Sequence, residues 1–127
     1  MRESNPKKQG DKGLGIAIGY YAAKGYTVSI PLTDSQSYDL IVEIEHVLQR
    51  VQVKTATFQR NGKYECNLKV CGGNRSAGNI IKRFDATTVD VIFVVTEEMT
   101  MYHIPSDKTN STTILVLGPK YQEYIVK

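Results

Sequence analysis

The chain has 127 residues, a length typical of one domain that buries about two-thirds of its unfolded surface in a single core. Its 16 Lys and Arg against 13 Asp and Glu give a net charge of +3, which permits nucleic-acid binding without arguing for it. Two cysteines, Cys66 and Cys71, are too few for a disulfide scaffold, and their spacing fits no zinc site. The polar start and the lack of a long apolar run exclude a signal peptide and a membrane span, so we expect a soluble, cytoplasmic protein.

We expect a flexible basic segment at residues 1–8, followed by a single domain at residues 9–127. From Leu14 onward, apolar positions recur at the spacing of one helical face, and Gly25 suits the left-handed residue that ends such a helix. The apolar positions of this face are Leu14, Ala17, Ile18, Tyr21 and Ala22. A strand is predicted at residues 26–31 and a turn at 33–37.

Two β-rich runs follow, at residues 38–44 and 48–58, and Asn61-Gly62 then predicts a hairpin with a two-residue type I′ turn. With Arg60 opposite Lys63, this register places Lys54 opposite Lys69. By the same register, Val53 lies opposite Val70 and Thr55 opposite Leu68. One face then carries Val51, Val53, Leu68 and Val70, and a polar face carries Gln52, Lys54, Asn67 and Lys69. Two like charges across a ladder favour an anion between them, and a phosphate would serve.

Residues 71–78 are expected to form a glycine-rich loop containing Asn74 and Arg75, which is either a phosphate cradle or a plain connection. A basic helical turn is expected at residues 80–84. Strands are predicted at residues 90–96, 101–105 and 113–117, and a short helix at 118–125. This order indicates a mixed α/β sandwich rather than a barrel.

Asp39, Gln52 and Lys54 lie on the two neighbouring β-rich runs, so a carboxylate, an amide oxygen and an ammonium are expected to converge. A carboxylate and a neutral oxygen can hold a hard divalent cation, and a lysine can orient a water and offset charge on a phosphate. The pattern therefore predicts a phosphodiester-cleaving site. A polar triplet without chemistry is the alternative.

The chain resembles the PD-(D/E)xK nuclease superfamily, most of all its small branch of homing endonucleases and of phage and bacterial endonuclease domains. The matching segments are Gly10-Asp11-Lys12-Gly13, Gly25-Tyr26-Thr27-Val28, Pro31-Leu32, Tyr38-Asp39-Leu40, Gln52-Val53-Lys54, Val89-Asp90-Val91 and Met101-Tyr102-His103-Ile104-Pro105. The resemblance implies a restriction-endonuclease-like mixed α/β sheet, with an αβββαβ-type core flanked by helices and an added hairpin. It also implies a metal-dependent DNA endonuclease.

Under this resemblance, Asp39, Gln52 and the Val53 carbonyl hold Mg²⁺, for which Mn²⁺ would substitute, and Lys54 acts on the attacking water and the phosphate. DNA is the implied partner, and we expect a homodimer or homotetramer, because one small domain reads little DNA alone. The expected DNA contacts are Lys69, Asn74, Arg75, Lys82 and Arg83.

Two departures from the superfamily pattern bear on activity. Gln52 stands where most members have an acid, so a glutamate in its place is expected to tighten the metal site. Leu14 stands where many relatives carry a first-helix glutamate. Asp11, one turn earlier, is a candidate replacement in the catalytic set, and Gln9 is a weaker one. The competing explanation of Asp11, which the sequence favours, is an acidic residue stabilised near a helix N-terminus. The alternative function is a catalytically inactive nuclease-fold protein that binds DNA or a protein partner.

Overall fold

A computed structural model describes the backbone of residues 1–68, 70–74, 78–109 and 113–127, and the side chains of these residues except 70–74 and 78–82. The helices are α1 (Pro6–Ala23) and the 3₁₀ helices η1 (Ser106–Lys108) and η2 (Pro119–Tyr124). The first strands are β1 (Thr27–Ser29), β2 (Leu40–Ile44), β3 (Val47–Ala56), β4 (Phe58–Arg60), β5 (Lys63–Asn67) and β6 (Val70–Asn74). The later strands are β7 (Gly78–Lys82), β8 (Val91–Thr96), β9 (Met101–Pro105), β10 (Ile114–Leu117) and β11 (Ile125–Val126). None of the helices in this described part is long and apolar enough to cross a membrane.

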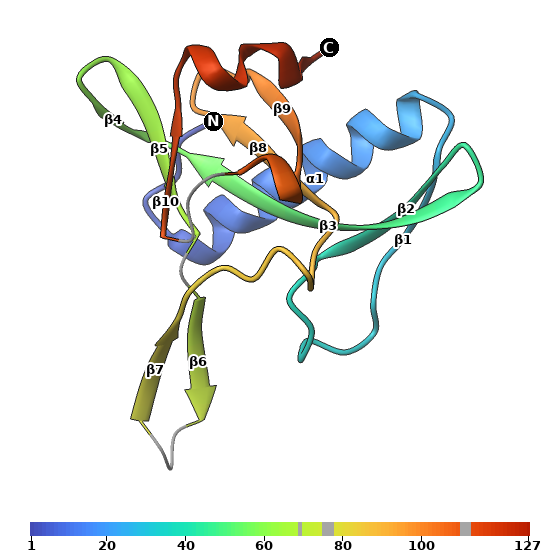
Figure 1. Cartoon of the computed structure of the whole chain (residues 1–127), viewed down its shortest axis with the longest axis horizontal. Coiled ribbons are helices and arrows are strands. Elements are labelled where there is room, and N and C mark those ends of the chain that lie inside the picture. The colour runs from blue at the N-terminus through green and yellow to red at the C-terminus, as the bar shows by residue number, and fades with distance from the viewer. Residues whose placement is uncertain (69, 75–77, 110–112) are drawn as a thin grey trace.

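The strands form a six-stranded sheet with the order β1-β2-β3-β8-β9-β11, a three-stranded sheet with the order β10-β5-β4, and the separate hairpin β6-β7. The large sheet is mixed, because β3 pairs with β2 in antiparallel fashion and with β8 in parallel fashion. Helix α1 crosses one face of this sheet, while β6 and β7 project away from the body of the molecule (Figure 1). This architecture confirms the predicted mixed α/β class.

Helix α1 begins where Asn5 supplies an N-cap, its side chain accepting hydrogen bonds from the backbone N–H groups of Lys7 and Lys8. The helix therefore includes three of the first eight residues. It ends as predicted, with Gly25 at a φ of +85°. Gly13 allows α1 to lie close to β3, because a Cβ there would sit 2.5 Å from Cγ2 of Thr55.

Two apolar clusters fill the two faces of the large sheet. The cluster under α1 contains Ala17, Tyr21, Leu40, Val42, Val51, Val91, Phe93 and Val95. The cluster between the two sheets contains Ala56, Cys66, Leu68, Phe84, Val89, Ile92, Val94, Tyr102, Ile104, Leu115, Leu117 and Tyr121. Successive residues of β8 alternate between the clusters, so this strand is buried on both sides, as its apolar sequence predicts. Gln52, Lys54 and Ala56 alternate along β3 and therefore share one face of the strand. Ala56 packs in the cluster between the two sheets, so this face points toward the second sheet.

Both tight turns of the first half have the positive φ angles that type I′ geometry requires. Asn61 and Gly62 have φ of +54° and +76°, and Arg60 pairs with Lys63, which confirms the predicted hairpin. Glu45 and His46 have φ of +51° and +69° between β2 and β3.

The hairpin register is wrong beyond residue 58. β3 ends at Ala56, Val53 pairs with Phe93 and Thr55 with Val95, both on β8, while Val70 pairs with Lys82. Leu68 lies in the cluster between the sheets and therefore does not share a face with Val51. The reason is tertiary, because β3 buries both of its faces as an inner strand, and a hairpin partner would take the edge that β8 occupies. The opposition of Lys54 and Lys69 fails with this register, and Lys69 itself lies outside the described residues.

The predictions for residues 71–74 and 80–82 are also wrong in their local structure. Residues 71–74 belong to β6 and residues 80–82 to β7, where a loop and a helical turn were expected. Across the described residues between β3 and β8 the connection contains strands and no helix, so the second helix of the expected αβββαβ order is absent there.

Candidate nuclease site

The candidate site lies at the end of the β2–β3 ladder where β2 begins, just before Leu40. The Asp39 N–H donates to the Val51 carbonyl at 2.8 Å. The Val53 N–H donates at 2.8 Å to Oδ2 of Asp39, so a side-chain carboxylate replaces a backbone carbonyl in the ladder. No second bond to this carboxylate is found within the described residues, which leaves Oδ1 open. The backbone of β3 thereby orients one edge of a carboxylate that is only partly shielded from solvent.

Gln52 is the buried polar residue of the site, with only 7% of its surface exposed. Its Nε2 donates to the Ser37 carbonyl at 3.0 Å, which fixes the orientation of the amide. Its Oε1 is buried and has no hydrogen-bond partner within the described part of the chain. A buried acceptor without a partner costs about 1–3 kcal/mol, so this oxygen is well suited to a cation or a donor from outside the protein.

Lys54 lies two residues farther along β3 on the same face as Gln52 and is half-buried. Burial raises the pKa of the Asp39 carboxyl, while the Val53 N–H and the Lys54 ammonium oppose that rise. The same ammonium also acts on Cys66 of β5, although burial dominates there and raises the pKa of the Cys66 thiol to about 12. The Lys54 ammonium is therefore close enough to act on both the Asp39 carboxyl and Cys66 of the second sheet.

Arg50 and Asp90 form an ion pair beside the site that the sequence did not indicate. The guanidinium binds the carboxylate through two atoms, with Nε to Oδ2 at 3.0 Å and Nη2 to Oδ1 at 3.1 Å. Asp90 also accepts from the Arg50 N–H at 2.8 Å, while its own N–H donates to the Arg50 carbonyl at 2.9 Å. The Arg50 guanidinium lowers the pKa of the Asp90 carboxyl. This ion pair joins β3 to the residue before β8. Its Arg50 lies two residues before Gln52.

The donors at this position suit a hard cation. In the part of the chain that the structure describes, no three His, Cys, Asp or Glu side chains gather as a ready-made metal cluster. A carboxylate oxygen of Asp39, the unpartnered Oε1 of Gln52 and the Val53 carbonyl are all oxygen donors, which Mg²⁺ prefers and completes with water.

Comparison with known proteins decides the family. A family model described as PD-(D/E)XK endonuclease matches residues 4–124. The chain belongs to the PD-(D/E)XK endonuclease family. A solved bacterial homing endonuclease, I-Ssp6803I, is similar over 96% of this chain and 89% of that chain, with a TM-score of 0.78 and 23% sequence identity. No curated protein matches the sequence.

The first helix of this PD-(D/E)XK chain brings no acid to the site among the described contacts. Leu14 packs against the cluster under α1, so an apolar side chain fills the position where many relatives carry glutamate. Asp11 is exposed on α1, which covers the sheet face opposite that of Gln52 and Lys54. Gln9 accepts from the Glu3 N–H through Oε1 at 2.7 Å and is thereby held by the N-terminal segment.

The predicted DNA contacts are described only in part. Lys69 and Arg75 lie outside the described residues. The backbones of Asn74 and Lys82 belong to β6 and β7, and their side chains are not described. Arg83, directly after β7, is exposed. The expected basic surface therefore includes the hairpin that projects from the PD-(D/E)XK body (Figure 1).

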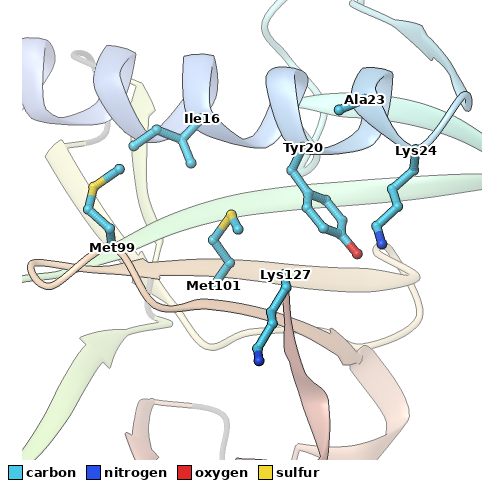
Figure 2. A pocket seen from close by; sticks show the side chains of 7 residues that line it. All are labelled: Ile16, Tyr20, Ala23, Lys24, Met99, Met101 and Lys127. Atoms are coloured by element: carbon cyan, nitrogen blue, oxygen red, sulfur yellow. The ribbon is translucent and has the colours of Figure 1, made fainter.

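A separate groove of about 510 Å³ lies on the α1 side of the sheet. Figure 2 shows Ile16 and Tyr20 of α1 across from Met99 and Met101, with Lys24 and Lys127 at its rim. Among the described residues that line this groove there is no Asp or Glu side chain. The groove and the Asp39–Gln52 position are thus distinct features of the molecule.

Proposed function

We propose that this PD-(D/E)XK protein is a divalent-metal-dependent endodeoxyribonuclease. The observation that carries the proposal is the Gln52 amide, whose Oε1 is buried without a partner while its Nε2 is bound to Ser37. An acceptor held in this state, next along β3 to the Val53 N–H that binds the Asp39 carboxylate, favours a cation over a purely structural role.

In this proposal Asp39, Gln52 and the Val53 carbonyl hold Mg²⁺, with Mn²⁺ as a substitute. When bound, the cation lowers the pKa of a water ligand and offsets charge on the phosphate. The Val53 N–H fixes the Asp39 carboxylate, and Ser37 fixes the Gln52 amide. Lys54 orients the attacking water and stabilises charge that develops on the scissile phosphate. Asp11 has no comparable support from the geometry.

Duplex DNA is the proposed substrate, since the similar structure is that of a homing endonuclease. The hairpin β6-β7 and Arg83 supply phosphate contacts, together with Lys69, Asn74, Arg75 and Lys82. We further propose a homodimer or homotetramer, because cleavage of both strands requires two sites.

The test is incubation of the purified protein with supercoiled, linear and branched DNA in Mg²⁺, in Mn²⁺ and in EDTA. We expect cleavage only with added cation, and its loss in Asp39→Asn and Lys54→Met. Cleavage that persists in EDTA would refute the proposed mechanism.

The packing of Leu14 favours one second candidate, a nuclease-fold protein that binds DNA without cutting it. An apolar side chain at that position removes a carboxylate that many relatives use. The same incubations separate the two functions, because the second predicts salt-dependent DNA binding without cleavage under any cation. Binding to a protein partner instead predicts neither cleavage nor affinity for DNA.

A further inference from the structure

The Gln52 side chain bridges two parts of the chain that the backbone ladder does not join. Strand β2 begins at Leu40, so Ser37 lies outside the paired region. Within the described contacts, Ser37 is tied to β3 through the hydrogen bond from Gln52 Nε2 to its carbonyl. Two residues later, Asp39 is tied to the same strand through Val53. The segment that leads into Asp39 is thus held by side chains of the site itself.

An amide can do two things at once that a carboxylate cannot. It donates through nitrogen and accepts through oxygen, whereas an ionised carboxylate only accepts. At Gln52 the donating end is occupied by Ser37 and the accepting end is free. The bond to Ser37 therefore decides that Oε1, and not Nε2, is the end of the amide left without a partner among the described residues.

We propose that Gln52 is a positioning residue that must be an amide, because its Nε2 anchors Ser37 while its Oε1 faces the cation. The anchor at Ser37 fixes the segment that leads into Asp39. The identity of the ligand at Oε1 rests on the proposed function, whereas the anchoring of Ser37 does not. The anchor acts on Asp39 through Tyr38, the one residue that separates it from Ser37.

This inference reverses the expectation drawn from charge alone for Gln52→Glu. A carboxylate at this position would place a second acceptor against the Ser37 carbonyl, where the present donor and acceptor are 3.0 Å apart. The anchor would be lost and the two oxygens would repel each other. Loss of a group that orients a metal ligand costs about 10- to 100-fold in metal affinity, and this loss opposes the gain from the added charge.

The first measurement uses NMR to record backbone hydrogen exchange at the Asp39 and Val53 amides in the absence of any divalent cation. We compare wild type with Gln52→Glu and with Gln52→Met, which keeps the length of the side chain without its donor. Both variants are expected to exchange these two amides about tenfold faster, while the Phe93 amide in buried β8 stays unchanged. Gln49→Glu, the same change on the same strand, is the matched control and is expected to leave all three amides unchanged.

The second measurement is calorimetric titration of the same proteins with Mn²⁺ in the absence of DNA. Gln52→Glu is expected to bind Mn²⁺ about tenfold more weakly than wild type. Exchange at Asp39 and Val53 that matches wild type in both Gln52 variants would overturn the inference, as would tighter Mn²⁺ binding by Gln52→Glu. Faster exchange in a protein whose wild type binds no Mn²⁺ would support the anchor and defeat the proposed metal-dependent function.

Discussion

The Oδ2 atom of Asp39 accepts a hydrogen bond of 2.8 Å from the backbone N–H of Val53. The carboxylate thus takes the place of a backbone carbonyl just before β2 begins at Leu40. Asp39→Asn retains an oxygen that can accept this bond. We therefore expect a folded variant whose DNA cleavage falls by about 10²-fold or more, because the negative charge that binds the cation is gone. Cleavage rates and thermal unfolding are to be measured together. Asp34→Asn, an exposed change in the preceding turn, should leave both unchanged.

Lys54→Met keeps the apolar stem of the lysine beside the second sheet and removes its ammonium. We expect a loss of about 10²-fold or more in the single-turnover cleavage rate, since a positioned positive charge near the phosphate is lost. Affinity for DNA should change by less than the rate. Lys63→Met, an exposed position on β5, is the control, and equal losses in both variants would argue against a catalytic role for Lys54.

Asp90→Ala removes the carboxylate that binds both the guanidinium and the N–H of Arg50. We expect the free energy of unfolding to fall by about 1–2 kcal/mol. The loss is small because both side chains are partly exposed, so solvent screens much of their attraction. Arg50 lowers the pKa of Asp90, so this stabilisation is complete above the unfolded pKa of about 4 and is lost as the pH falls through the lower folded value. Urea unfolding at pH 7 and at pH 3 measures the difference between wild type and variant, which should shrink at pH 3. Glu98→Ala is the control.

His103 of β9, which contacts Tyr21 of α1, gives the free energy of unfolding a second pH dependence. Its Nδ1 lies 2.9 Å from the hydroxyl of buried Tyr21, and burial lowers the pKa of the imidazole. The unfolded chain then binds the proton more tightly, so the free energy of unfolding should fall as the pH drops below about 6.5. Urea unfolding between pH 7.5 and 5 measures this slope. His103→Phe should flatten it, and His46→Asn, in an exposed turn with positive φ, should not.

Reversal of charge at Arg83 tests the proposed DNA surface. If about four phosphates are neutralised per subunit, log K should fall with log salt with a slope of about −3 to −4. Arg83→Glu is expected to weaken binding to all sequences alike and to make that slope shallower by about one, because phosphate contacts carry no base readout. Fluorescence anisotropy at several salt concentrations measures both. Lys120→Glu, in η2, is the control. A change confined to one DNA sequence would contradict this role.

Local signals were sufficient for several elements. The helical spacing from Leu14, the Gly25 that ends α1, and the Asn61-Gly62 turn were all predicted and observed. The buried strand β8 and its hairpin partner β9 were predicted as well. Each depends on the φ preference of one or two residues or on a short apolar pattern, and these are properties of the segment itself.

The partners of β3 were decided by tertiary packing. The hairpin register holds for the pairs from Arg60–Lys63 to Phe58–Glu65 and then ends. It ends because β3 lies inside the large sheet, where it pairs with β2 and β8. Strand pairing over long sequence distances follows from which faces are buried together, and the same alternating pattern on β3 is compatible with either partner.

The sequence by itself brought Asp39, Gln52 and Lys54 to attention as residue types suited to a cation and a phosphate. It did not contain the bond from Gln52 to Ser37 or the one from Val53 to Asp39, because in each a backbone atom is one of the two partners. Every residue except proline offers the same backbone donor and acceptor, so no side-chain pattern marks the ones that matter. Only the tertiary structure decided which end of the Gln52 amide remains free, since that depends on where the chain departs from the ladder before Leu40.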